Sequence, residues 1–211
     1  MSEQAAVARF VRENVVEPDH IARARQHARE LGANPVSTVV GAQLAFVTAS
    51  AASKSIIEIG TGAGVSGLWL LHGAPGATLT TIDNEPEHLG AAREAFQAAR
   101  VPSARVRWIT GRSGDVLPRM NEAAYDIVLV DGGSENMLAD VEHGLRLARP
   151  GGVVLVPRVL AGGRVADPVA RDELTASCRT LLSETREAPG VVASLFPAGE
   201  GLLQLATVPT A

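Results

Sequence analysis

Hydrophobic and polar positions in this chain follow a helical spacing at first and a strand spacing later. Four apolar residues share one face of a helix that Asp19 can cap and that Gly32 ends: Ile21, Ala24, Ala28 and Leu31. A second helix is predicted over residues 37–52. From residue 55 onward, short β-branched runs stop at glycines or acidic residues. Such runs are typical of buried parallel strands.

Strands and helices then alternate along the rest of the chain. The predicted strands are 55–59, 78–82, 106–109, 126–130 and 153–156, and the predicted helices are 65–73, one beginning at Pro86, 114–121, 136–148 and 168–185. Two last strands, 191–196 and 202–208, are joined by Gly199-Glu200-Gly201 without a helix. Strand–helix alternation requires right-handed crossovers and helices on both faces of the sheet. The pattern predicts an α/β fold with a doubly wound, mostly parallel sheet of about seven strands and an antiparallel edge strand.

Length and composition fit one folded domain. The chain has 211 residues, of which 46% are hydrophobic and 20% are charged, a globular composition. We expect a single domain over 1–211, with N-terminal helices (1–52) that cap a core (53–211).

Charge and cysteine content narrow the class of partner. A net charge of −4 argues against a general nucleic-acid or membrane-surface binder, because both need a positive field. Arg23, Arg25 and Arg29 are interpreted as a solvated helix face, with a local basic patch as the alternative. The single Cys178 cannot form an internal disulfide, and the N-terminus lacks the apolar run of a signal peptide. We therefore expect a cytoplasmic protein that binds neither nucleic acid nor membrane.

The glycine-rich turn Glu58–Gly64 follows the first predicted strand. Doubly wound sheets bind ligands at the carboxyl ends of their strands, and glycines let the backbone approach a ligand closely. The segment Gly62–Gly67 also reads GxGxxG, with Asp83 about twenty residues further on. The turn alone is therefore compatible with a nicotinamide dinucleotide.

Three carboxylates at strand ends favour a cationic ligand. Glu58, Asp83 and Asp131 each follow or end a predicted strand, and a pyrophosphate would be repelled there whereas an ammonium or sulfonium group would be attracted. Each also has a purely structural alternative. Glu58 could accept hydrogen bonds from the turn, Asp83 could cap the helix at Pro86, and Asp131 could form a turn.

At this point the sequence resembles the catechol-O-methyltransferase-type, cation-dependent O-methyltransferases, which have a Rossmann-like class I methyltransferase fold. The resemblance covers nearly the whole chain from about residue 20 and lies in Glu58–Ser66, Thr80–Asp83, Thr110–Asp115, Tyr125–Asp131 and Arg149–Val153. It implies S-adenosyl-L-methionine as methyl donor and S-adenosyl-L-homocysteine as product.

The resemblance also implies a set of binding residues. Val36, Glu58, Gly60, Ser66 and Asp131 would surround the methionine part, Asp83 and Asn84 the ribose, and Ser113 the adenine region, with Thr61 and Gly62 completing the turn.

The metal site of this family is not preserved. The family holds a divalent cation with the aspartate after the fourth strand and an Asp-Asn pair after the fifth, and uses a lysine as base. Here Asp131 remains, but the pair is Pro157-Arg158 and the lysine position is Ser134. Proline offers no side-chain ligand and arginine is a permanent cation, so we predict no divalent metal. Asp131 and Arg158 are predicted to be catalytic, with Arg158 paired to Asp131 and binding the acceptor anion.

The resulting hypothesis is an O-methyltransferase for a small hydroxylated or carboxylated acceptor, active as a homodimer. The alternatives are a catalytically weak or inactive protein that binds donor or product, and a nicotinamide oxidoreductase. The acceptor is not identified.

Secondary features leave further choices open. Residues 159–167 are either a lid or a connector, and the five histidines are expected in helices away from the ligand edge. Aromatic residues make up 3% of the chain, so Trp69 and Trp108 are assigned to the core and no stacking cage is expected.

Overall fold

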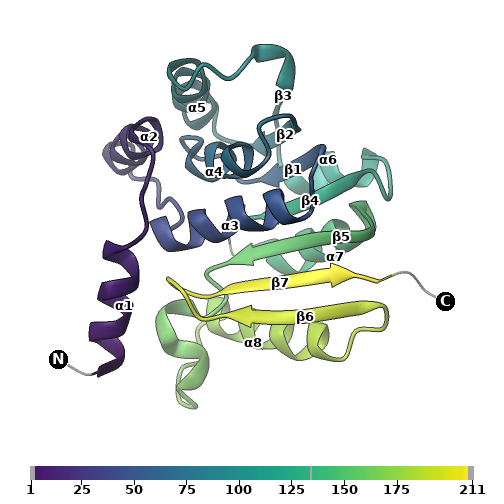
Figure 1. Cartoon of the computed structure of the whole chain (residues 1–211). Helices are drawn as coiled ribbons and strands as arrows, with labels where there is room; N and C mark the ends of the chain where they lie inside the picture. The colour runs from purple at the N-terminus through teal and green to yellow at the C-terminus, as the bar shows by residue number, and fades with distance from the viewer. Residues whose placement is uncertain (1–2, 134, 209–211) are drawn as a thin grey trace.

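The computed structural model describes residues 3–133 and 135–208, and its strands form one sheet in the order β3-β2-β1-β4-β5-β7-β6 (Figure 1). The strands are β1 (Ser55–Ile59), β2 (Thr78–Asp83), β3 (Val106–Thr110), β4 (Tyr125–Val130), β5 (Ala148–Pro157), β6 (Val191–Phe196) and β7 (Leu202–Thr207). Strands β1 to β5 are parallel, whereas β7 is antiparallel to both of its neighbours. The predicted α/β fold with a mostly parallel seven-stranded sheet is confirmed.

Helices cover both faces of this sheet. They are α1 (Glu3–Glu13), α2 (Asp19–Glu30), α3 (Thr38–Ser50), α4 (Val65–Gly73), α5 (Pro86–Ala98), α6 (Ser113–Val116), α7 (Met137–Leu147) and α8 (Glu173–Arg186). In Figure 1, α3 crosses in front of the sheet and α7 and α8 lie behind it. None of the helices in the described ranges is long and apolar enough to cross a membrane.

The side chains of the strands alternate between the two faces of the sheet and form one hydrophobic core on each face. Ile56 of β1 packs in a cluster with residues of α2, α3 and α4, whereas Ile57 and Ile59 pack in a second cluster with α7 and α8. Successive side chains of a strand point to opposite faces, so a strand covered on both sides must be apolar throughout. Every residue of β4 is buried. Cys178 belongs to the second cluster with 0% exposure, as a packing residue.

Several elements differ from the prediction in their extent, among them α6, which ends at Val116 and not at residue 121. Asp19 is the first residue of α2 and not its cap, because Pro18 precedes the helix and makes no side-chain cap hydrogen bond. Helix α1 was not predicted, since its apolar Phe10 stays exposed and marks no core face. Helix α8 begins at Glu173, where Asp172 accepts a hydrogen bond from the Thr175 amide at 3.0 Å. Strand β5 begins five residues early, at Ala148.

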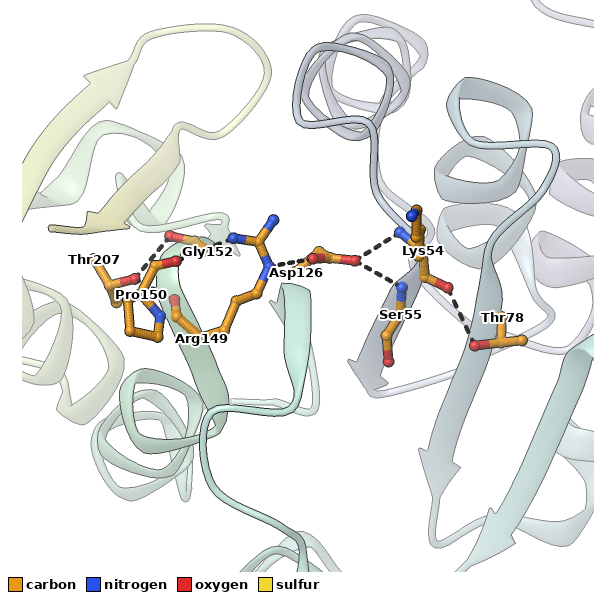
Figure 2. A network of polar contacts seen from close by, with 8 residues as sticks. All are labelled: Lys54, Ser55, Thr78, Asp126, Arg149, Pro150, Gly152 and Thr207. Atoms are coloured by element: carbon orange, nitrogen blue, oxygen red, sulfur yellow. Dashed lines mark hydrogen bonds and ion pairs between the residues drawn. The ribbon is translucent and has the colours of Figure 1, made fainter. Parts of the chain in front are cut away.

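A polar network connects the amino-terminal ends of the central strands (Figure 2). Asp126 of β4 accepts hydrogen bonds from the backbone amides of Lys54 (2.6 Å) and Ser55 (2.8 Å) and forms an ion pair with Arg149. Thr207 donates to the Arg149 carbonyl at 2.6 Å. Burial alone would raise the pKa of Asp126, but the bonds from Lys54, Arg149 and Ser55 outweigh it and lower the pKa. One carboxylate therefore joins β1, β4 and β5.

We predict that Asp126→Asn lowers the free energy of unfolding by about 1–3 kcal/mol at pH 7, because charge-assisted bonds are replaced by weaker ones. A carboxylate whose pKa is lowered by folding stabilises the folded protein at pH values above the ordinary aspartate pKa of about 3.9. This stabilisation is lost as the pH falls through the pKa of the folded state. Urea unfolding should therefore show the two proteins converging at low pH. The exposed Asp115→Asn removes the same charge and should change stability little; equal losses in both variants would contradict the prediction.

Candidate functional site

A cavity of about 640 Å3 opens at the carboxyl ends of β1, β2 and β4. Of the residues predicted to bind the donor, those in its wall are Gly60, Thr61, Gly62, Ser66, Asp83, Asn84, Ser113 and Asp131. The other two, Val36 and Glu58, are not part of that wall: Val36 lines a smaller neighbouring cavity, and Glu58 is buried beneath the turn with 0% exposure. Two of the three predicted carboxylates therefore face the larger cavity directly.

Gly60 sits where the turn passes closest to the end of β4. Its φ is +90°, and a Cβ atom at this position would clash with the carbonyl group of Asp131. The Gly60 amide donates to the Ile82 carbonyl at 2.9 Å, and the Asp131 amide donates to the Ile59 carbonyl at 2.8 Å. Only glycine combines this backbone conformation with this approach.

Asp83 fixes the turn to the end of β2. Its Oδ2 accepts a hydrogen bond from the Gly62 amide and its Oδ1 accepts one from the Glu85 amide, each at 2.9 Å. The N-cap of α5 is Glu85, so Asp83 does not cap that helix. His88 lines the same cavity, with its Nδ1 3.7 Å from Asp83 Oδ1. The expectation that all histidines lie away from the ligand edge is therefore wrong for His88, because α5 begins at Pro86, directly after β2 ends at Asp83, and its first turn stays beside the cavity.

Glu58 accepts hydrogen bonds from two hydroxyl groups, not from the backbone of the turn. Ser66 Oγ donates to it at 2.6 Å and Thr81 Oγ1 at 2.7 Å, and Thr61 Oγ1 lies 2.6 Å from Thr81 Oγ1. Burial raises the pKa of Glu58 to about 8; the two hydroxyl bonds oppose this shift and the nearby carboxylates of Asp131 and Asp83 add to it. Near neutral pH the free protein therefore holds Glu58 largely protonated.

Asp131 and Arg158 form an ion pair between the ends of β4 and β5. Arg158 has a left-handed backbone with φ of +65°, donates its amide to the Gly201 carbonyl at 2.7 Å, and donates from Nη1 to the Asn34 carbonyl at 3.1 Å. Burial raises the pKa of Asp131 to about 6, Arg158 opposes this shift, and Glu200 adds to it.

The residues at this position do not suit a divalent cation. Hard cations need several oxygen ligands, but Pro157 offers none and the Arg158 guanidinium contacts the Asp131 carboxylate. Within 3–133 and 135–208, no group of three or more His, Cys, Asp or Glu side chains could hold a metal ion. Ser134, which stands at the family's lysine position, lies outside the described residues.

A second cavity of about 270 Å3 adjoins the first. The two share four lining residues, Ala33, Asn34, Pro35 and Arg158. Further residues of the second cavity include Arg25, Arg29, Val36 and Glu200. Sequence reasoning missed Glu200, because only the antiparallel pairing of β6 with β7 brings their turn beside Arg158.

The loop over residues 159–167 behaves as a connector to α8. None of its residues belongs to the lining of either cavity. Arg179 of α8 donates hydrogen bonds to the carbonyls of Val165 (3.1 Å) and Ala170 (2.7 Å), which fixes the loop against the helix. The lining residues of the two cavities likewise include no Phe, Tyr or Trp among the described positions. Trp69 is 2% exposed in the core, and Trp108 packs edge-on against Phe96.

Comparisons with known proteins agree on one class. Residues 57–156 match the family described as a methyltransferase domain. A protein of Mycobacteroides abscessus that carries the name of an O-methyltransferase is 42% identical over 190 residues, which is 90% of this chain and 88% of that protein. A similarly named protein of Mycobacterium tuberculosis is 43% identical over 184 residues, covering 87% and 82% of the two chains.

Solved structures show the same similarity. A Corynebacterium glutamicum protein aligns with a TM-score of 0.89 at 27% identity, over 100% of this chain and 99% of that one. The O-methyltransferase TomG of Streptomyces achromogenes, in complex with S-adenosylmethionine, aligns with a TM-score of 0.86 at 28% identity over 99% and 100%. A Bacillus cereus O-methyltransferase in complex with S-adenosylhomocysteine aligns at 0.84 and 25% identity, over 96% and 97%.

We predict that Glu58→Gln is at least as stable as the native protein at pH 8, because an uncharged isostere keeps the buried network. Because folding raises the pKa of Glu58 to about 8, the folded protein loses stability as the pH rises from the ordinary glutamate pKa toward that value. The native protein should lose up to about 1.4 kcal/mol per pH unit in that window relative to the variant. Urea unfolding from pH 5 to pH 8.5 measures this difference; parallel stability curves for the two proteins would rule it out.

Proposed function

Because this chain belongs to the S-adenosylmethionine-dependent O-methyltransferases, we propose that it methylates an oxygen of a small hydroxylated or carboxylated acceptor without a divalent cation. The observation that carries this proposal is the Arg158–Asp131 ion pair, which puts a fixed cation where the resembled family puts its metal. The larger cavity takes the donor, and the smaller one takes the acceptor.

The donor is held mainly by backbone and carboxylate groups. Asp83 accepts hydrogen bonds from the ribose hydroxyls, because its oxygens keep free lone pairs beside the two bonds from backbone amides. Asn84 lies beside Asp83 in the cavity wall. Ser113 faces the adenine region, and the Gly60–Gly62 turn leaves room for the methionine part. The S-adenosylmethionine complex of TomG and the S-adenosylhomocysteine complex of the Bacillus cereus O-methyltransferase support this choice of ligand.

The chemistry needs alignment and an anionic acceptor. When bound, S-adenosylmethionine supplies a methyl group already activated on sulfonium; the new C–O bond forms as the C–S bond breaks, and sulfur keeps the bonding electrons. Arg158 stabilises the attacking oxyanion with its guanidinium. A hydroxyl acceptor gives its proton to Asp131, whose raised pKa of about 6 makes it a stronger base than an ordinary aspartate. A carboxylate acceptor needs no base.

The competing hypothesis is a protein that binds donor or product with little or no turnover. It is favoured by the same ion pair, since Arg158 could merely neutralise Asp131. The two hypotheses differ in what the removal of Arg158 does to catalysis.

We expect Asp83→Asn to weaken S-adenosylhomocysteine binding by about 10- to 100-fold, because a charged acceptor of hydrogen bonds becomes a neutral one. Isothermal titration calorimetry measures this, with Asp115→Asn as the charge-matched control. The native protein should bind the sulfonium donor and its product but not NADH. Binding of NADH alone would refute the assignment of the cavity.

We expect Arg158→Ala to lower turnover at least about 100-fold, with donor affinity changing no more than a few-fold. Arg158→Lys keeps the positive charge but loses the paired guanidinium donors, so its turnover should lie between those of the native protein and Arg158→Ala. The assay is S-adenosylhomocysteine formation from a panel of phenols and hydroxy acids, with and without chelator. The native rate should be unaffected by chelator. Turnover that survives Arg158→Ala, or that stops on chelation, would reject the proposed role.

The homodimer and the cytoplasmic location stay predictions. The outer strand β6 exposes Val192 (58%) and Leu195 (44%), which supports an apolar contact between copies. Sedimentation equilibrium measures the oligomeric state directly.

A further inference from the structure

The smaller cavity is lined by three arginines that are used in different ways. Arg25 and Arg29 come from α2, and Arg158 comes from the end of β5. Arg25 and Arg29 are four residues apart and so share one face of the helix. What each guanidinium contacts decides which of them is available to a ligand.

Arg25 is committed to the protein itself. It is 7% exposed, donates to the Glu17 carboxylate through Nε at 3.0 Å and Nη2 at 2.7 Å, and donates through Nη1 to the Val36 carbonyl. The interpretation of Arg25 as part of a solvated helix face is therefore wrong; it pairs with Glu17 and holds the 33–37 segment against α2. Arg158 also has protein partners, Asp131 and the Asn34 carbonyl, but it lines both cavities and stays accessible there to the reacting oxygen.

Arg29 is different. It lines the smaller cavity, its side chain is exposed, and its guanidinium has no ion pair or hydrogen-bond partner within the described part of the chain. Its cavity also borders Arg158, the residue assigned to the reacting oxygen. We propose that Arg29 selects an acceptor that carries a carboxylate in addition to the oxygen that is methylated. This inference rests on the proposed function and narrows its acceptor to hydroxy acids and similar anions.

Glu200 and the size of the cavity define the rest of the acceptor. Glu200 lies in the same wall, on the turn between β6 and β7, and would repel a second negative charge. One anionic group therefore faces α2, and a neutral hydroxyl faces Arg158 and Glu200. The cavity of about 270 Å3 is smaller than the roughly 300–1,000 Å3 that drug-sized ligands occupy. Since no aromatic side chain is among the described residues of its wall, charge is the strongest means of recognition that this cavity offers.

The test compares matched acids and amides. The probes are 2-, 3- and 4-hydroxybenzoate, each paired with its hydroxybenzamide, and the readout is S-adenosylhomocysteine formation. For the acid that reacts best, the native kcat/KM should exceed that of its amide by about 10-fold, a modest preference because Arg29 is exposed. Arg29→Gln should abolish this preference by raising KM for the acid while leaving kcat for the amide within about 2-fold. Arg29→Lys should restore part of it.

The control is Arg23→Gln, which removes the same charge from the same helix at an exposed position outside both cavities. It should keep the acid-to-amide ratio of the native protein. Added salt should shrink the ratio in the native protein and not in Arg29→Gln, a response that a merely structural role would not produce. A ratio that survives Arg29→Gln, or a native preference for the amide, overturns the proposal.

A binding measurement separates this inference from the proposed function. If no probe is methylated, the hydroxybenzoates are titrated calorimetrically into protein saturated with S-adenosylhomocysteine. Binding that Arg29→Gln weakens about 10-fold supports the role of Arg29 while the catalytic proposal fails. If the native protein binds none of the three acids, or if Arg29→Gln binds them equally well, the role of Arg29 is rejected.

Discussion

The close passage of the Gly60 backbone against the Asp131 carbonyl group is the constraint on which the rest of the site depends. It holds the end of β1 beside the ends of β2 and β4, because Gly60 and Asp131 donate their amides to the neighbouring strands. A side chain at residue 60 would push these ends apart and separate Asp83 from Asp131. At the opposite edge of the sheet, Asp126 holds the amino ends of β1 and β4 together (Figure 2). The carboxyl ends of the strands can therefore carry glycines and loops, while polar contacts hold the amino ends of the same strands together.

Charge in the larger cavity is less negative than a count of carboxylates implies. Glu58 is buried and largely protonated in the free protein, and Asp131 is paired with Arg158. Asp83 lines the cavity with His88 3.7 Å away, and Glu85 and Glu135 belong to the same wall. Of the three predicted carboxylates, Asp83 and Asp131 therefore face a ligand in the larger cavity, whereas Glu58 supports the turn from beneath.

The sequence predicts the sheet well because a doubly covered strand has to be apolar along its whole length, as in β4. The glycine turn, Asp83 and Asp131 were also found, since strand ends meet at one edge of any doubly wound sheet. Three kinds of feature could not be found this way. Helix α1 exposes its apolar residues, His88 lines the larger cavity from the first turn of α5, and Glu200 reaches the smaller cavity through the pairing of β6 with β7. Each depends on a tertiary arrangement that leaves no local periodicity.

Arg158 touches three stretches of chain that are far apart in sequence: Asn34 ahead of α3, Asp131 after β4, and Gly201 at the start of β7. It also belongs to the walls of both cavities. A ligand in either cavity therefore meets the same side chain, and replacing Arg158 alters the walls of both compartments at once.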